Sequence, residues 1–144
     1  MTAMNNYNQS IVEEFRSNKG VVGGPFEGAT MLLLTHTGAK SGTVRTNPLV
    51  YLDDGDRYLI FASKGGASTN PDWYRNLLAN PAATIEVGTD KFAVDATELV
   101  GEERDRLWNK NAELRPGFAQ YQRNTTRRIP VIALKRTGQV EVRS

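Results

Sequence analysis

The sequence of 144 residues contains no cysteine and a single histidine, His36. Without cysteine the chain can form no disulfide, thiolate nucleophile, iron–sulfur ligand or zinc site built on thiolates. A metal site would therefore need oxygen ligands, and the Asp and Glu residues show no regular spacing of that kind. We expect no metal centre.

Long apolar stretches are also missing. The longest purely aliphatic run, residues 31–34, is far shorter than the ~20 residues of a membrane span. Residues 1–10 are polar and lack the apolar core of a secretory signal, which predicts a cytoplasmic protein. The length fits one domain, so we expect a single domain over 1–144, with an N-terminal helical segment over 1–19 and a barrel core over 30–136.

Acidic residues are absent from two long segments, although the net charge is only +2. Residues 28–52 contain no Asp or Glu but include Lys40 and Arg45. Residues 114–140 likewise contain none, and their basic residues are Arg115, Arg123, Arg127, Arg128, Lys135 and Arg136. This segregation indicates an anionic partner, which could be a phosphate group, a nucleic acid or an acidic membrane surface.

Apolar periodicity and turn residues predict a mainly β (α+β) fold, a small barrel of about six mostly antiparallel strands with flanking helices. The expected strands are residues 31–37, 44–52, 57–63, 83–87, 91–100 and 130–135. Pro48 lies inside the second strand and predicts a sheet edge or a bulge. Three helices are expected. The first has a capping box at Ser10 and Glu13, and the second runs from an Asn70 cap to about residue 79. The third covers residues 102–114 and is ended by Pro116 and Gly117.

Two glycine-rich loops carry the residues best suited to bind an anion. Residues 38–42 include Lys40 and Ser41, but the spacing of their glycines does not match a phosphate-binding P-loop. Either an anion site with Arg45 or an ordinary surface hairpin fits this loop. Residues 62–66 lead to the start of a helix, another feature that favours an anion.

Two further groups of residues allow alternative interpretations. At the start of the second helix, Trp73 and Tyr74 either pack in the core or form an aromatic wall for a planar ligand. His36 fits a hydrogen-bonded structural role better than a catalytic one, and the sequence has no nucleophile-elbow pattern of a serine hydrolase.

The two loops and their flanking segments resemble the deazaflavin-dependent nitroreductase family of actinobacteria, whose cofactor is coenzyme F420. The matching segments are residues 37–42, 45–49, 62–66, 70–74, 76–77 and 79–81, with a weaker match at 128–131. The resemblance extends over about residues 20–134 and implies a split β-barrel. It also implies an oxidoreductase that transfers a hydride from reduced deazaflavin to a small activated acceptor, a quinone-like or nitro compound.

The resemblance assigns roles to individual residues. It implies that Lys40, Ser41 and Arg45 hold the anionic tail of the cofactor. The other residues that it implies for the deazaflavin ring, its ribityl chain and the wall beside them are Thr46, Asn47, Pro48, Leu49, Ala62, Ser63, Lys64, Trp73, Tyr74 and Asn76.

The implied substrate pocket differs from that of the family's best-known nitroreductase. Val50, Arg115 and Phe118 stand where that enzyme has tyrosines, and Tyr121 keeps the third tyrosine of its C-terminal pocket. The resemblance therefore implies a kept cofactor site and a changed acceptor site. It also implies a separate F420-reducing dehydrogenase as the source of reduced cofactor.

Several alternatives stay open at this point. The same barrel could use FMN, or it could be a non-catalytic carrier that binds the deazaflavin or an anionic lipid. A homodimer and peripheral contact with the inner face of the membrane are also open. A nucleic-acid module fits least well, because the basic residues do not alternate with a row of stacking aromatics.

Overall fold

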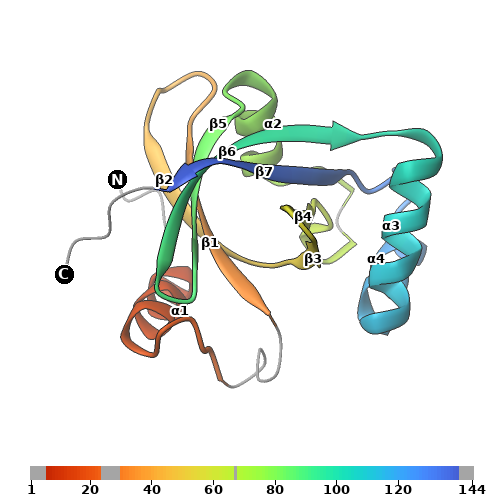
Figure 1. Cartoon of the computed structure of the whole chain (residues 1–144). Coiled ribbons are helices and arrows are strands. Elements are labelled where there is room, and N and C mark those ends of the chain that lie inside the picture. The colour runs from red at the N-terminus through yellow and green to blue at the C-terminus, as the bar shows by residue number, and fades with distance from the viewer. Residues whose placement is uncertain (1–5, 24–29, 67, 140–144) are drawn as a thin grey trace.

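The computed structural model describes residues 6–23, 30–66 and 68–139. Within them, a seven-stranded antiparallel sheet in the order β2-β1-β5-β6-β7-β4-β3 carries four α-helices (Figure 1). In chain order the elements are α1 (Asn6–Ser17), β1 (Met31–Thr37), β2 (Val44–Val50), β3 (Leu52–Asp54), β4 (Arg57–Phe61), a 3₁₀ turn (Lys64–Gly66), α2 (Asp72–Ala79), β5 (Ala82–Val87), β6 (Asp90–Leu99), α3 (Gly101–Leu114), α4 (Pro116–Arg123) and β7 (Val131–Gln139).

One bent segment joins the two edges of the sheet. β2 pairs with β1 and β3 pairs with β4, so the strand expected over 44–52 is divided at Tyr51. The Tyr51 N–H still donates to the Thr30 carbonyl, at 3.1 Å. Because β2 and β3 lie at opposite ends of the strand order, this bend curls the sheet into the predicted split barrel. Pro48 lies in the edge strand β2, as expected.

The side chains of β1 alternate between two cores, which explains its unbroken aliphatic sequence. Leu32 and Leu34 fill the barrel interior with Ile60, Ile85 and Leu134, among others. On the opposite face, Met31 and Leu33 pack under α1. A strand with both faces buried has no polar alternation. A third cluster, between the barrel and α3 and α4, holds Trp108 and Ile129.

Two glycines define tight turns in different parts of the fold. Gly55, with a φ of 72°, turns the β3–β4 hairpin, and its N–H donates to Asp53 Oδ1 at 3.0 Å. Gly20, which comes just after α1, lies very close to the β5–β6 turn. A Cβ there would be 2.7 Å from the Cα of Gly88 in that turn. Only glycine permits this approach, which fixes α1 against the barrel.

The predicted starts of two helices were wrong. α1 begins at Asn6, so Ser10 and Glu13 lie within the helix instead of capping it. The N-cap position of α2 is Pro71, without a side-chain cap, because the Asn70 side chain accepts a hydrogen bond from Arg127 instead.

The C-terminal third contains a helix that the sequence pattern does not predict. Pro116 ends α3 as expected but also occupies the first turn of α4, where proline is favoured. β7 continues to Gln139, beyond the expected end at residue 135, because β6 is long enough to pair with it. None of the described helices is long and apolar enough to cross a membrane.

Candidate functional site

Two adjoining cavities lie where α1, β2 and the start of α2 meet. The larger, of about 580 Å³, lies between α1, β2 and α2, and the smaller, of about 400 Å³, lies between the 38–42 loop and α2. Arg45 and Asp72 line both cavities. Of the residues expected to bind the cofactor, those that line one or both are Lys40, Ser41, Arg45, Thr46, Asn47, Lys64, Trp73 and Asn76.

The cavities carry an excess of unpaired positive charge. Of the two described acidic lining residues, Asp72 is paired with Arg75, and Glu13 accepts a hydrogen bond from Gln9. Among the described residues, Lys40, Arg45 and Lys64 form no ion pair. Arg45 Nε is moreover buried without a hydrogen-bond partner in the described part of the chain. A buried donor without a partner is costly, so this group is suited to bind an acceptor supplied by a ligand.

A chain of hydrogen bonds connects the walls of the two cavities. Asn76 Oδ1 accepts from the Ala39 N–H at 2.9 Å, and Asn76 Nδ2 lies 3.1 Å from His36 Nδ1. His36 Nε2 lies 2.6 Å from Asn47 Oδ1. His36 is 2% exposed, and burial, together with Arg45, lowers its pKa while Asn47 and Asp72 partly oppose that shift. His36 is thus hydrogen-bonded on both ring nitrogens, as the structural interpretation expects.

Arg127 holds the second glycine-rich loop in place. It donates to the carbonyls of Ala62 and Ser63, at 3.0 and 2.8 Å, and to Asn70 Oδ1 at 2.7 Å. Between these contacts Lys64 takes a left-handed φ of 46°, which is uncommon for a residue with a side chain. The sequence marked Arg127 only as one of several basic residues, and nothing in its spacing signals this contact.

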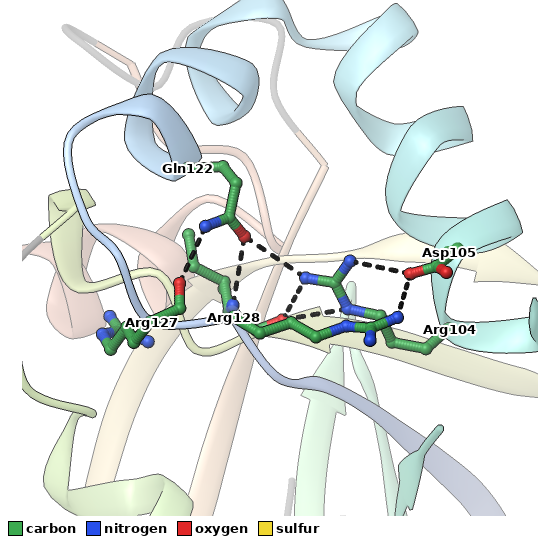
Figure 2. Close-up of polar contacts among 6 residues, drawn as sticks. Arg104, Asp105, Gln122, Arg127 and Arg128 are labelled. Atoms are coloured by element: carbon green, nitrogen blue, oxygen red, sulfur yellow. Dashed lines mark hydrogen bonds and ion pairs between the residues drawn. The ribbon is translucent and has the colours of Figure 1, made fainter. Parts of the chain in front are cut away.

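A second arginine fixes the backbone that carries Arg127 (Figure 2). The buried Arg104 of α3 donates through Nε and Nη2 to the Ile129 carbonyl, at 3.2 and 2.6 Å. Gln122 of α4 accepts from the Ile129 N–H at 3.1 Å and donates to the Arg127 carbonyl at 2.8 Å. Asp105 pairs with Arg104 and with Arg128 on the outer side. These contacts join α3, α4 and the segment before β7 into one support.

Five residues expected at the cofactor lie outside the lining of both cavities. Leu49 and Tyr74 pack against the barrel core, and the Tyr74 hydroxyl donates to Glu98 Oε1 at 2.6 Å. Burial, and next the contact with Glu98, raises the pKa of Tyr74 to about 12. The other three residues are Pro48, Ala62 and Ser63. Their contact with a cofactor stays a prediction.

The four residues expected in the substrate pocket are divided among different parts of the fold. Val50 packs against the cluster under α1, whereas Phe118 and Tyr121 pack against the cluster between the barrel and α3. Arg115 donates to Asn111 Oδ1 at 3.0 Å and to Thr30 Oγ1 at 2.8 Å. The structure does not bring the four together around either cavity, and their shared role stays a prediction.

Comparison with known proteins decides the family. The family model described as F420H(2)-dependent quinone reductase matches residues 8–136. The chain belongs to this family. An F420H(2)-dependent quinone reductase of Mycobacterium tuberculosis is 44% identical over 128 residues, 85% of each chain. A second protein of that organism, a putative F420H(2)-dependent quinone reductase, is 40% identical over 104 residues, 72% of this chain and 87% of its own.

Solved structures of related proteins support the same fold. An F420-H2 dependent reductase (FDR-A) is 40% identical, with a TM-score of 0.68, and the match covers 74% of this chain and 94% of that one. A protein described as a domain-swapped dimer is 35% identical, with a TM-score of 0.70, covering 90% of this chain and 95% of that one. The matched residues of the family include the whole lining of both cavities.

Proposed function

We propose that this protein binds coenzyme F420 in the two adjoining cavities and catalyses F420H2-dependent reduction of a quinone. The family match over residues 8–136 and the names of the relatives support the reaction. The observation that carries the proposal for the site is the pair of cavities lined by Lys40, Arg45 and Lys64, three cations without an ion pair among the described residues.

The donors of these cavities fit the chemistry of the cofactor. F420 has a phosphate and a carboxylate-bearing tail, which arginine and lysine bind through charge-assisted hydrogen bonds. Arg45 Nε is a buried donor without a partner in the described chain, and the small cavity also offers Lys40 and Ser41. In the larger cavity, Trp73 supplies an apolar face for a planar ring.

When bound in its reduced form, the deazaflavin supplies a hydride from its C5 position, and the quinone takes up this hydride and a proton from solvent to give the hydroquinone. The protein would then have to bind both molecules at once and hold the reacting atoms about 3–3.5 Å apart. This scheme needs no cysteine and no acid–base pair, consistent with a chain that has one histidine.

A binding titration separates the cofactors. We expect F420 to quench the fluorescence of Trp73, which lines the cavity, and FMN to bind much more weakly. The variant Trp108→Phe removes the other tryptophan, which lies in the distant cluster against α3, so that Trp73 becomes the single reporter. Preferential binding of FMN would contradict the proposed cofactor, whereas F420 binding without turnover of any acceptor would favour a carrier.

Two partners complete the proposal. A separate dehydrogenase regenerates F420H2, and adding such an enzyme with its substrate should sustain quinone reduction with catalytic amounts of F420. The relative described as a domain-swapped dimer supports a homodimer. Light scattering on the purified protein gives the mass directly and distinguishes a dimer from the monomer of 16.0 kDa.

A further inference from the structure

In the hydrogen-bond chain of the cavity wall, one backbone N–H determines which group donates and which accepts at every step. The Ala39 N–H can only donate, and it lies 2.9 Å from the side-chain oxygen of Asn76. Asn76 must therefore turn its NH₂ group the other way, where it lies 3.1 Å from His36 Nδ1. Since this NH₂ group donates, His36 Nδ1 has to accept.

The direction passes through the histidine ring to the next strand. A ring nitrogen that accepts carries no hydrogen, so the neutral imidazole of His36 carries its hydrogen on Nε2. Nε2 lies 2.6 Å from the Asn47 side chain, and the atom that faces it must be the amide oxygen. The NH₂ group of Asn47 is thereby turned away from His36. This orientation follows from the order of donors and acceptors that begins at the Ala39 N–H. It does not depend on how the oxygen and nitrogen atoms of the asparagine amides were assigned.

The surroundings of His36 keep the ring neutral. It is 2% exposed, and burial is the largest effect on its pKa, which it lowers, as does Arg45 on the neighbouring strand. The hydrogen bond with Asn47 and the charge of Asp72 at the start of α2 oppose this shift only in part. An imidazolium would also present an N–H to the NH₂ group of Asn76, which is a contact between two donors. Both the burial and the geometry select the neutral form.

Asn47 lines the larger cavity, and its Nδ2 has no hydrogen-bond partner in the described part of the chain. We propose that His36 is a positioning residue: as the Nε2–H tautomer it fixes the Asn47 amide with its NH₂ group presented to the ligand. The site then selects a ligand with a hydrogen-bond acceptor at this point, such as a carbonyl or phosphate oxygen, and disfavours a donor there. Identifying that ligand as the deazaflavin rests on the proposed function.

The tautomer can be observed directly, because His36 is the single histidine of the chain. The experiment uses protein without a histidine tag, with isotope-labelled histidine and no ligand. In the NMR spectrum, long-range couplings between the ring nitrogens and the carbon-bound ring hydrogens show which nitrogen is protonated. We expect one neutral species with hydrogen on Nε2 at neutral pH. A ring protonated on Nδ1, or an imidazolium, would overturn the proposal whatever the protein binds.

Affinity for coenzyme F420 tests the presented donor. Asn47→Ala removes the donor, and we expect affinity to fall about tenfold. Asn47→Asp has almost the same shape but puts an anionic acceptor where the NH₂ group was, and should reduce affinity by about a hundredfold. The control Asn109→Asp adds the same charge at an exposed position on α3 and should leave affinity unchanged. Equal affinities of Asn47→Asp and the wild type would overturn the proposal.

Two substitutions of the histidine separate positioning from packing. The longer amide of His36→Gln reaches the place of Nε2 and can donate to Asn47, whereas the shorter amide of His36→Asn reaches only the place of Nδ1. We expect His36→Gln to keep affinity within about threefold and His36→Asn to lose about tenfold. Equal affinities would overturn the positioning role. If the wild type binds no F420, the proposed function fails, and the NMR spectrum still decides the tautomer.

Discussion

Arg45 lies where the two cavities meet, and its side chain is the clearest candidate for an anion contact. Its Nε is buried without a partner in the described chain, and its neighbours in the cavities include the unpaired Lys40. A charged hydrogen bond to an anion contributes more than a neutral one, and in a partly enclosed cavity salt screens it less than at an open surface.

Replacing Arg45 by Gln should weaken F420 binding about 10- to 100-fold, which corresponds to the roughly 1.5–3 kcal/mol of a charge-assisted hydrogen bond. Arg45→Lys keeps the charge but not the fork of donors and should recover only part of the affinity. Lys110→Gln, at an exposed position on α3, removes one positive charge far from the cavities and serves as the control. An Arg45→Gln variant that binds like this control would remove Arg45 from the site.

His36 should make stability depend on pH. Its pKa lies below the ordinary 6.5 in the folded protein because burial disfavours the charged ring, so the unfolded chain binds the proton more readily. The stabilisation by the neutral ring is therefore fully present above about pH 6.5 and is lost as the pH falls through the pKa of the folded state.

The free energy of unfolding of the wild type should thus fall between about pH 7 and pH 5, and it should fall less in His36→Gln, which cannot titrate there. Urea denaturation at a series of pH values measures both curves. Parallel curves would mean that His36 has the same pKa in the folded and unfolded states.

At single positions, the sequence predicted which residues lie at the cavities better than it predicted their contacts. Lys40, Arg45 and Lys64 were recognisable because their loops match family motifs, and all three line the cavities. The role of Arg127 was not recognisable, because it follows from a fold that brings residue 127 beside residues 62, 63 and 70. Spacing along the chain contains no sign of such a contact.

The second glycine-rich loop depends on the C-terminal third of the chain. Its carbonyls at Ala62 and Ser63 are bound by Arg127, whose own backbone is held by Gln122. Gly66 lies so close to α4 that a Cβ there would be 2.9 Å from the Tyr121 carbonyl. α4 is thus a support for the loop that presents Lys64, although it lines neither cavity.

Arg127→Ala should loosen this loop. We expect faster amide hydrogen exchange at residues 62–66 and about tenfold weaker F420 binding, since the buried carbonyls lose their charged donor. Exchange in the β5–β6 hairpin should not change. Arg123→Ala, on the exposed side of α4 with a contact to Gln120, is the matched control. Unchanged exchange at residues 62–66 would show that Arg127 is not what holds the loop.

Regular elements with a clear periodicity were predicted well, and those set by tertiary contacts were not. β1 matches its predicted bounds, since an aliphatic run between turns leaves little choice. The start of α1 was missed because the residues before Ser10 are polar and show no apolar face. The sequence does not predict α4, because Pro116 fits the end of α3 as well as the first turn of a new helix.

The order of the strands in the sheet could not be predicted from the sequence. The split barrel came from the family resemblance and from a count of strands, and the structure confirms it with a seventh strand made by the bend at Tyr51. The order β2-β1-β5-β6-β7-β4-β3 follows from long-range pairing, for which local patterns hold no information. The larger cavity could therefore not be predicted from the sequence, because its lining comes from elements far apart in the chain, among them α1, β2, the Lys64 turn and α2.

We propose that the deazaflavin and its acceptor bind between these elements, where hydride transfer requires no acid or base from the protein. Family membership and the cation-lined cavities support one account, in which the barrel binds F420H2 and presents it to a quinone. Because the cofactor supplies the chemistry and the protein positions it, we expect the reaction to be specific for the deazaflavin as donor.

The most direct test is anaerobic oxidation of F420H2 by a soluble naphthoquinone, followed through the visible absorbance of the oxidised deazaflavin. We expect turnover that needs both the enzyme and the quinone, that yields one hydroquinone for each F420H2 consumed, and that falls in Arg45→Gln. Reduced FMN or a reduced nicotinamide should not replace F420H2. Failure of the wild-type protein to speed this oxidation, or equal rates with reduced FMN, would contradict the account.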